Sequence, residues 1–204
     1  MWLATATDSP WRGLAEALNA GLPVPDGFVV CPHTSERETR DTYEELKTRT
    51  RVHFVAVRGP SHAALNLIGP DALIHTLRRF WSEAPGASIL IQRMVPSAWC
   101  GKAQWHGQNL RIEANEGLMI LDPDTYLFST DEGKCVQKAI APKQRKMIRY
   151  VDGTLRTVER DGERTPLTED QLKSVADLAV RAKADITWAI DDQDRAWLIS
   201  LNGT

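Results

Sequence analysis

A series of short strand-like segments follows one another between residues 102 and 159. The segments alternate apolar and polar residues, and the turns that separate them contain Gly, Asp-Glu-Gly, Pro-Lys or Asp-Gly. Alternation with a period of two indicates half-buried strands, and short turns of this kind join antiparallel neighbours. Much of the second half of the chain is therefore predicted to form an antiparallel sheet.

The sequence DITWAIDDQDRAWLISLNGT, residues 185–204, predicts a further β-hairpin with a turn at residues 191–194. Ile186, Trp188 and Ile190 would share the buried face of its first strand, because alternate side chains of a strand point to the same side. Thr187 would then lie on the opposite face. We expect Ser200 on the second strand to point the same way as Thr187.

Helices and strands are mixed in the first half of the chain. Ser9 and Pro10 predict the start of a helix, and further helices are expected at residues 36–49, 70–83 and 168–183. The segment PSHAALNLIG is expected to be a loop. We therefore predict an α+β fold in a single domain, 1–204, with an N-terminal lobe (1–86), a mainly antiparallel C-terminal lobe (87–204) and a cleft between them.

Composition limits the classes of function. The net charge of −2 provides no basic field for a nucleic acid. Three cysteines without metal-type spacing suggest reduced thiols, and no segment has the length of a membrane span or the pattern of a signal peptide. We expect a cytoplasmic protein that binds neither nucleic acid nor membrane.

Four segments in one order resemble the ATP-grasp nucleotide-binding domain of phosphoenolpyruvate synthase and pyruvate phosphate dikinase, whose relatives include rifampicin phosphotransferase. These segments are GLPVPDGFVV, VAVRG, ILIQRMVPSAWCG and LTEDQLKSVADLAVRAKADITWAI with AWLISL after it. The resemblance implies an ATP site between two lobes. It also implies phosphate transfer to a histidine on another domain or to a small substrate, which would require further polypeptides.

The resemblance assigns roles to several residues. Arg58 would contact phosphate, although it could instead be a strand-end charge that reaches water. Gln92, Met94 and Val95 would lie beside adenine and bind it through backbone groups, unless their strand is an ordinary core strand. We further expect the strand at residues 88–95 and the hairpin at residues 185–201 to share one sheet that walls the cleft. Separate sheets would refute the family assignment itself.

Other positions depart from the family pattern. Pro10 stands where a phosphate-binding lysine is usual, with Arg12 the nearest cation. Thr187 replaces a magnesium-binding glutamate and Ser200 a magnesium-binding glutamine, and hydroxyl groups supply no charge. ATP is therefore the expected ligand, whereas Mg²⁺ binding should be weak or absent.

Two alternative functions are consistent with these departures from the family pattern. The first is a degenerate, stand-alone ATP-grasp domain without phosphotransfer activity, which acts as a binding or regulatory protein with a protein partner. The second is a minimal ATP-dependent phosphotransferase, of the small-molecule or histidine kinase type, that a partner completes. Titration with ATP in the presence and absence of magnesium separates them.

Several other polar residues have simpler interpretations. Asp191, Asp192 and Asp194 are expected to serve the hairpin turn rather than a metal. His62 and His106 are expected to be exposed histidines, since no neighbouring carboxylate in the sequence orients either ring. The basic segment KQRKMIR, residues 143–149, is expected to be a solvated face or a docking site for an acidic partner.

Overall fold

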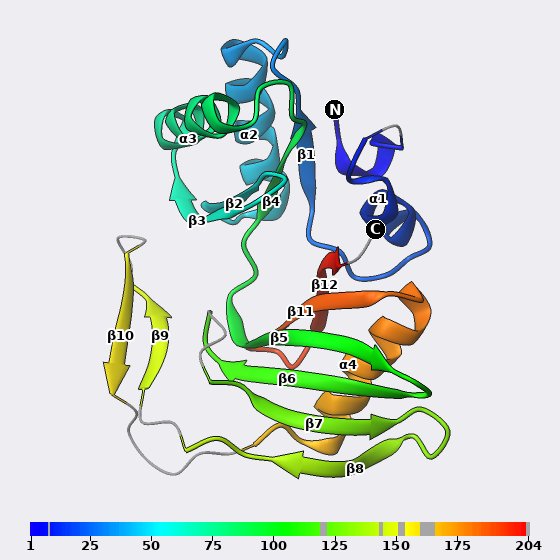
Figure 1. The fold of residues 1–204 in the computed structure, drawn as a ribbon. Helices are drawn as coiled ribbons and strands as arrows, with labels where there is room; N and C mark the ends of the chain where they lie inside the picture. The colour runs from blue at the N-terminus through cyan, green and yellow to red at the C-terminus, as the bar shows by residue number, and fades with distance from the viewer. Residues whose placement is uncertain (8, 119–121, 143–144, 151–153, 160–165, 203–204) are drawn as a thin grey trace. The chain divides into compact units, whose positions relative to one another are not determined.

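The computed structural model describes residues 1–7, 9–118, 122–142, 145–150, 154–159 and 166–202. The chain divides into two compact units. The first unit consists mainly of Met1–Ala20 and Pro25–Met94, and the second mainly of Gly21–Val24, Val95–Tyr150 and Leu155–Thr204. The predicted α+β class is confirmed, since each unit combines helices with a largely antiparallel sheet (Figure 1). The division into lobes at residue 86 stays a prediction.

The first unit is built around a four-stranded antiparallel sheet with the strand order β1-β4-β2-β3. Its helices and strands are η1 (Leu3–Thr5), α1 (Arg12–Asn19), β1 (Gly27–Val30), α2 (Glu36–Thr50), β2 (Phe54–Arg58), β3 (Ala63–Ile68), α3 (Pro70–Glu83) and β4 (Ile89–Arg93).

Helices α2 and α3 lie together over this sheet (Figure 1). The apolar core that they form with the strands includes Phe28, Tyr43, Leu77 and Ile91, all nearly inaccessible to solvent. The Ser35 hydroxyl caps α2 by accepting a hydrogen bond from the Glu38 N–H group. Local capping and apolar burial thus agree in placing these helices.

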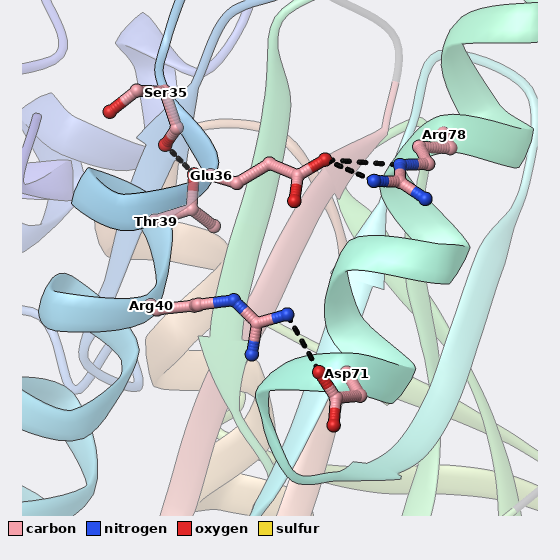
Figure 2. A network of polar contacts seen from close by, with 6 residues as sticks. All are labelled: Ser35, Glu36, Thr39, Arg40, Asp71 and Arg78. Carbon is pink, nitrogen blue, oxygen red and sulfur yellow. Dashed lines mark hydrogen bonds and ion pairs between the residues drawn. The ribbon is translucent and has the colours of Figure 1, made fainter.

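The outer surfaces of α2 and α3 are joined by two ion pairs (Figure 2). Arg40 contacts Asp71 at 2.6 Å, and both the Nε and Nη2 groups of Arg78 donate to Glu36. The side chains of Glu36 and Arg78 are half exposed or more. Pairs of this kind orient the helices but contribute little to stability, because water screens them.

Two predictions for the first unit were wrong. The helix expected at Ser9–Pro10 begins at Arg12, because Ser9 instead closes a turn in which its hydroxyl accepts from the Trp11 N–H group. The segment expected to be a loop after Arg58 contains β3, which pairs with β2. An irregular register between Val55 and Val57, together with a positive φ angle at Asn66, disturbs the alternation that would have revealed this strand.

The second unit contains a six-stranded antiparallel sheet with the order β12-β11-β5-β6-β7-β8, and a separate pair, β10-β9. Its strands and helix are β5 (Ser97–His106), β6 (Asn109–Glu116), β7 (Asp124–Ser129), β8 (Lys134–Ala139), β9 (Arg145–Arg149), β10 (Leu155–Glu159), α4 (Glu169–Ala182), β11 (Asp185–Asp191) and β12 (Ala196–Asn202). The predicted meander and hairpin are therefore present.

Helix α4 packs against one face of the six-stranded sheet and contacts strands β5, β6, β8, β11 and β12. Thr168 and Gln171 form the predicted capping box at its start. Ile186, Trp188 and Ile190 of β11 are fully buried, as their alternation predicts. Ala103 and Ile112 are equally buried on the neighbouring strands.

The expectation that residues 88–95 and the final hairpin share a sheet was wrong. Strand β4 belongs to the sheet of the first unit, and β5 is the strand that pairs with β11. Pro96 lies between β4 and β5, where a residue without an N–H group interrupts strand pairing. The apolar run on which the prediction rested therefore ends one sheet, and the next begins after the proline.

In the described part of the chain, no helix combines the length and the apolar composition that crossing a membrane requires.

Candidate functional site

The face of the six-stranded sheet opposite α4 carries polar side chains, and we call it the open face. A row of register partners crosses five of its strands. Ser200 of β12 is paired with Thr187 of β11, Thr187 with Lys102 of β5, Lys102 with Glu113 of β6, and Glu113 with Thr125 of β7. Cross-strand partners have Cα atoms about 5 Å apart, so these five residues form one continuous band.

Lys102 is the cation of this band. Its side chain is exposed, and Ala103, the next residue of β5, is buried on the side of α4. Among the described residues, the structure records no ion pair for Lys102. Its neighbour Glu113 contacts the guanidinium group of Arg111 at 3.1 Å and is only 19% exposed. The glutamate charge is thus partly neutralised, which leaves the Lys102 ammonium group accessible to an anion.

An apolar cluster lies on the same face, one pleat away from Lys102. Val95, Ala189 and Ile199 are buried in it, with Cys100 and Trp197 packed against them. Ala189 is the register partner of both Cys100 and Trp197. A β-bulge follows Thr187, and it lets both Ser200 and Ile199 contribute to this face. Alternation places Ala189 on the same polar face as Thr187, yet its side chain is only 2% exposed because this cluster covers it.

Asp191 anchors the end of this cluster. One carboxylate oxygen accepts from the backbone N–H groups of Gln193 and Arg195, and the other accepts from Trp197 Nε1 at 2.8 Å. Burial alone would raise the pKa of Asp191, but these hydrogen bonds outweigh it and hold the pKa below its usual range. The interpretation of Asp191 as a turn residue agrees with these contacts.

Arg58 and Gln92 are brought together in the first unit. Arg58 Nε donates to Gln92 Oε1 at 3.2 Å, and Gln92 Nε2 donates to the backbone oxygen of Pro25. Burial lowers the pKa of Arg58 to about 10, so the group stays charged at neutral pH. No carboxylate partner of Arg58 is recorded in the described part of the chain. A half-buried guanidinium group whose recorded partner is an amide can still bind an anion.

The other predicted adenine contacts fall on both sides of the unit boundary. Met94 closes the first unit, where its backbone N–H group donates to Phe54 O. Val95 opens the second unit and joins the apolar cluster. The roles of Arg58, Gln92, Met94 and Val95 in binding a nucleotide stay predictions.

Pro10 occupies the position predicted for the phosphate-binding lysine, and the nearest cation, Arg12, is already in an ion pair. Pro10 lies in the turn before α1, and Arg12 is paired with Glu16 at 2.7 Å on the exposed side of that helix. His62, expected to lack an orienting carboxylate, is paired with Glu83 and stacks edge-on against Phe80. Sequence proximity could not show this pair, because Glu83 lies at the other end of α3.

The residues of the open face do not fit a preformed magnesium site. Thr187 and Ser200 offer uncharged hydroxyl groups, and Glu113 is already paired with Arg111. No group of three or more His, Cys, Asp or Glu side chains arranged to hold a metal ion is found among the residues described. Magnesium is usually held by one or two carboxylates together with phosphate oxygens, so only a bound nucleotide would add enough ligands.

Lys102 and Glu113 were missed by the sequence-based prediction. The meander was recognised as a set of strands, but its register against the final hairpin was not inferred. The signal was available in principle, since Lys102, Gln104 and His106 alternate with Gly101, Ala103 and Trp105. What the sequence does not reveal is that β5, rather than β4, lies beside Thr187.

Comparison with known sequences gives no assignment. A scan against models of protein families finds no match, and none of the curated proteins matches the sequence.

Solved structures reveal the fold. D-alanine–D-alanine ligase from Coxiella burnetii aligns with 98% of this chain and 48% of its own, with a TM-score of 0.54 and 10% sequence identity. D-alanyl-alanine synthetase A from Vibrio cholerae has a TM-score of 0.54 and 14% identity over 98% of this chain and 56% of its own. D-alanine–D-alanine ligase from Bacillus anthracis, in a structure complexed with ATP, also has a TM-score of 0.54 and 10% sequence identity. The alignment covers 98% of this chain and 57% of that ligase.

The chain therefore has an ATP-grasp fold of the kind found in D-alanine–D-alanine ligases. It spans about half the length of these enzymes. At such low identity the likeness establishes the fold alone.

Proposed function

We propose that this chain binds an adenine nucleotide on the open face of the six-stranded sheet and transfers its phosphate poorly or not at all. One observation carries the proposal. An accessible ammonium group, Lys102, lies on the same face as the apolar cluster of Val95, Ala189 and Ile199, on directly adjacent strands. The ATP-grasp fold and the ATP complex of the B. anthracis ligase support the choice of ATP.

The two parts of the face suit the two ends of a nucleotide. The partly exposed members of the apolar cluster, Cys100 and Trp197, would contact a purine, and the Trp197 ring is held in place by Asp191. Lys102 is two residues from Cys100 along β5, roughly 7 Å away, and would take the phosphates. Thr187 and Ser200 hydroxyl groups would add hydrogen bonds to phosphate oxygens without adding charge.

Weak phosphotransfer follows from the same residues. Phosphoryl transfer depends on positioning and on neutralising the phosphates, chiefly with metal ions and cations. Hydroxyl groups at positions 187 and 200 leave that neutralisation to Lys102. The degenerate domain of the phosphoenolpyruvate synthase type, acting as a regulatory or partner-binding protein, is the finer form of this proposal. The order of the four sequence segments supports it, whereas the placement of β4 and the final hairpin in separate sheets counts against it.

A phosphotransferase that a partner completes is the second candidate, and one observation favours it. Lys102 supplies a cation that the motif comparison did not find, so the loss of phosphate-binding groups is less complete than the sequence suggests. Such an enzyme would still need its metal ligands and phosphate acceptor from another chain.

Isothermal titration with ATP, with and without Mg²⁺, tests nucleotide binding. We expect saturable binding that Lys102→Met weakens about tenfold or more, because one charge-assisted contact is lost. Lys138→Met is the matched control, since Lys138 lies on β8 of the same sheet and its register partner is the buried Tyr126. Equal affinities of the two variants, or no binding by the unmodified protein, would refute the open-face site.

Release of phosphate or AMP separates the two functions. The degenerate domain should hydrolyse ATP no faster than buffer in the presence of Mg²⁺. Hydrolysis that co-purifies with the protein and disappears in Arg58→Ala would favour the phosphotransferase instead.

A further inference from the structure

A hollow in the second unit lies outside the open-face band. Its volume is about 440 Å³, which is within the range of small-molecule sites. Strand β5 contributes its first residues, β6 its last, and β9 closes the hollow from a different sheet. The lining residues are Ser97, Ala98, Trp99, Glu116, Gly117, Lys146 and Ile148.

Gly117 allows β9 to close this hollow. Its backbone pairs with Met147 in a parallel bridge, and the Leu118 N–H group donates to Met147 O. A Cβ atom at position 117 would lie 2.3 Å from Met147 O, and the φ angle of +94° disfavours any other residue. This close approach places one side of β9, with Lys146 and Ile148, over the ends of β5 and β6.

The wall of the hollow contains one charge of each sign. Lys146 Nζ contacts Glu116 Oε1 at 2.8 Å, and the two side chains are 33% and 25% exposed. The pair is thus partly screened from water but still reachable from the hollow. Charged groups in such a position interact with a ligand more strongly than fully exposed ones.

Apart from Ser97, whose hydroxyl group donates to Val95 O, the other side chains of the lining are apolar. Trp99 is the register partner of Glu116, so its indole ring and the carboxylate lie beside each other. Ile148 is two residues from Lys146 on β9, and alternation puts both side chains on the same side. A ligand here would meet an ammonium group, a carboxylate, an aromatic ring and a branched aliphatic side chain.

From this arrangement we infer that the hollow binds a free α-amino acid with an apolar side chain. An α-amino acid carries its ammonium and carboxylate groups on a single carbon, and this short separation matches the adjacent Glu116 and Lys146. The ligand carboxylate would contact Lys146, its ammonium group would contact Glu116, and its side chain would pack between Trp99 and Ile148. This site is independent of the nucleotide proposal, because the two share no residue.

The purely structural alternative is that the ion pair only fastens β9 to β6. A fastening role predicts that substitution changes stability but creates no dependence on the charges of an added ligand. Binding of a zwitterion predicts such a dependence, and ligands blocked at either end measure it on the unmodified protein.

The test is calorimetric titration of the whole chain with L-leucine, L-phenylalanine and L-tryptophan. We expect at least one to bind saturably, and its N-acetyl and amide derivatives to bind about tenfold more weakly or worse, since each lacks one charge. Lys146→Gln should weaken the binding of the free amino acid to a similar extent. Lys173→Gln should not, because Lys173 lies on α4 and pairs with Asp177.

The location is checked by the indole N–H resonance of Trp99, assigned with a Trp99→Phe variant. The ligand that binds should shift this resonance. The proposal is overturned if none of the three amino acids binds, if blocked and free forms bind equally, or if binding leaves the Trp99 resonance unchanged. The unmodified protein provides these results even if a variant fails to fold.

Discussion

The two larger sheets of this chain differ in how many of their faces are buried. In the first unit, β4 has consecutive buried residues, and Leu90 and Ile91 are both fully inaccessible although they point to opposite faces. In the second unit, β6 alternates, so that Leu110 is buried and Arg111 is exposed. The first sheet is covered on both sides, whereas the second keeps one face for polar groups.

This difference separates stability from binding. A strand that is buried on both sides has no position that can change without disturbing the core. A strand with one polar face can carry Lys102, Thr187 and Ser200 while its other face maintains packing. The open face is therefore the part of the molecule where a site can be lost or acquired at little cost in stability.

The largest expected effect comes from truncating core residues. Leu90→Ala and Ile91→Ala should each reduce the free energy of unfolding by about 2–5 kcal/mol, because both leave cavities in packed surroundings. In β6, Leu110→Ala should have a similar cost, but Arg111→Ala should stay within about 0.5 kcal/mol. Urea denaturation of the four variants measures this. A mild effect of Leu90→Ala would show that the first sheet, like the second, has an open face.

Introducing metal ligands should produce the next largest effect. Thr187→Glu with Ser200→Gln places a carboxylate and an amide on paired positions of β11 and β12. We expect a magnesium-dependent gain in ATP affinity on the order of 1–3 kcal/mol, since a charged ligand is added. Titration with and without Mg²⁺ measures the gain. Catalysis need not return, because the two substitutions add no further cation for the phosphates.

The same pair of substitutions has an internal control. Thr187→Gln with Ser200→Gln adds two amides of similar size but no charge, and it should produce little magnesium dependence. An unchanged magnesium response in the folded glutamate variant would mean that positions 187 and 200 do not face the nucleotide phosphates.

Asp191 provides a smaller effect that depends on pH. Its folded-state pKa is lowered, so its charge stabilises the native state above the unfolded pKa of about 4, and this stabilisation disappears as the pH falls through the folded value. Asp191→Asn should reduce the free energy of unfolding by about 1 kcal/mol at pH 7 and should leave it unchanged at low pH. Unfolding followed from pH 7 to pH 3 gives the profile. The exposed neighbour Asp192→Asn is the control, and equal profiles would contradict the role of Asp191.

The smallest effect is expected on the outer surface of the first unit. Glu36→Gln removes the ion pair with Arg78, which is largely exposed (Figure 2). The change should cost less than about 0.5–1 kcal/mol and should diminish at high salt. Thermal unfolding at low and high salt checks this. A larger loss that salt does not reduce would mean that the pair contributes to the packing of α2 and α3.

Much of the fold could be predicted from the sequence because the decisive signals were local. The hairpin at residues 185–201, the Ser35 cap of α2 and the capping box of α4 depend on neighbouring residues, and the structure contains them. Strand β3 was missed because Asn66 has a positive φ angle and the register with β2 is irregular. Neither feature changes the sequence pattern in a recognisable way.

The candidate site was less predictable because it depends on pairing between distant segments. Thr187 and Ser200 are close in the sequence and were correctly placed beside each other. Lys102 reaches them only through the pairing of β5 with β11, and Glu83 reaches His62 only through the packing of α3. Apolar periodicity shows which residues are buried, but it does not show which strand lies beside which.

The position of β11 beside β5 has a consequence for the order of folding. Strands β5 to β8 pair with their neighbours in the sequence, so each step closes only a short loop. We expect β11 to pair with β5 after the intervening strands and α4 have formed, since contacts between distant segments form slowly. Lys102 and Thr187 therefore meet late, and a nucleotide bound to both would favour the completed sheet over every earlier intermediate.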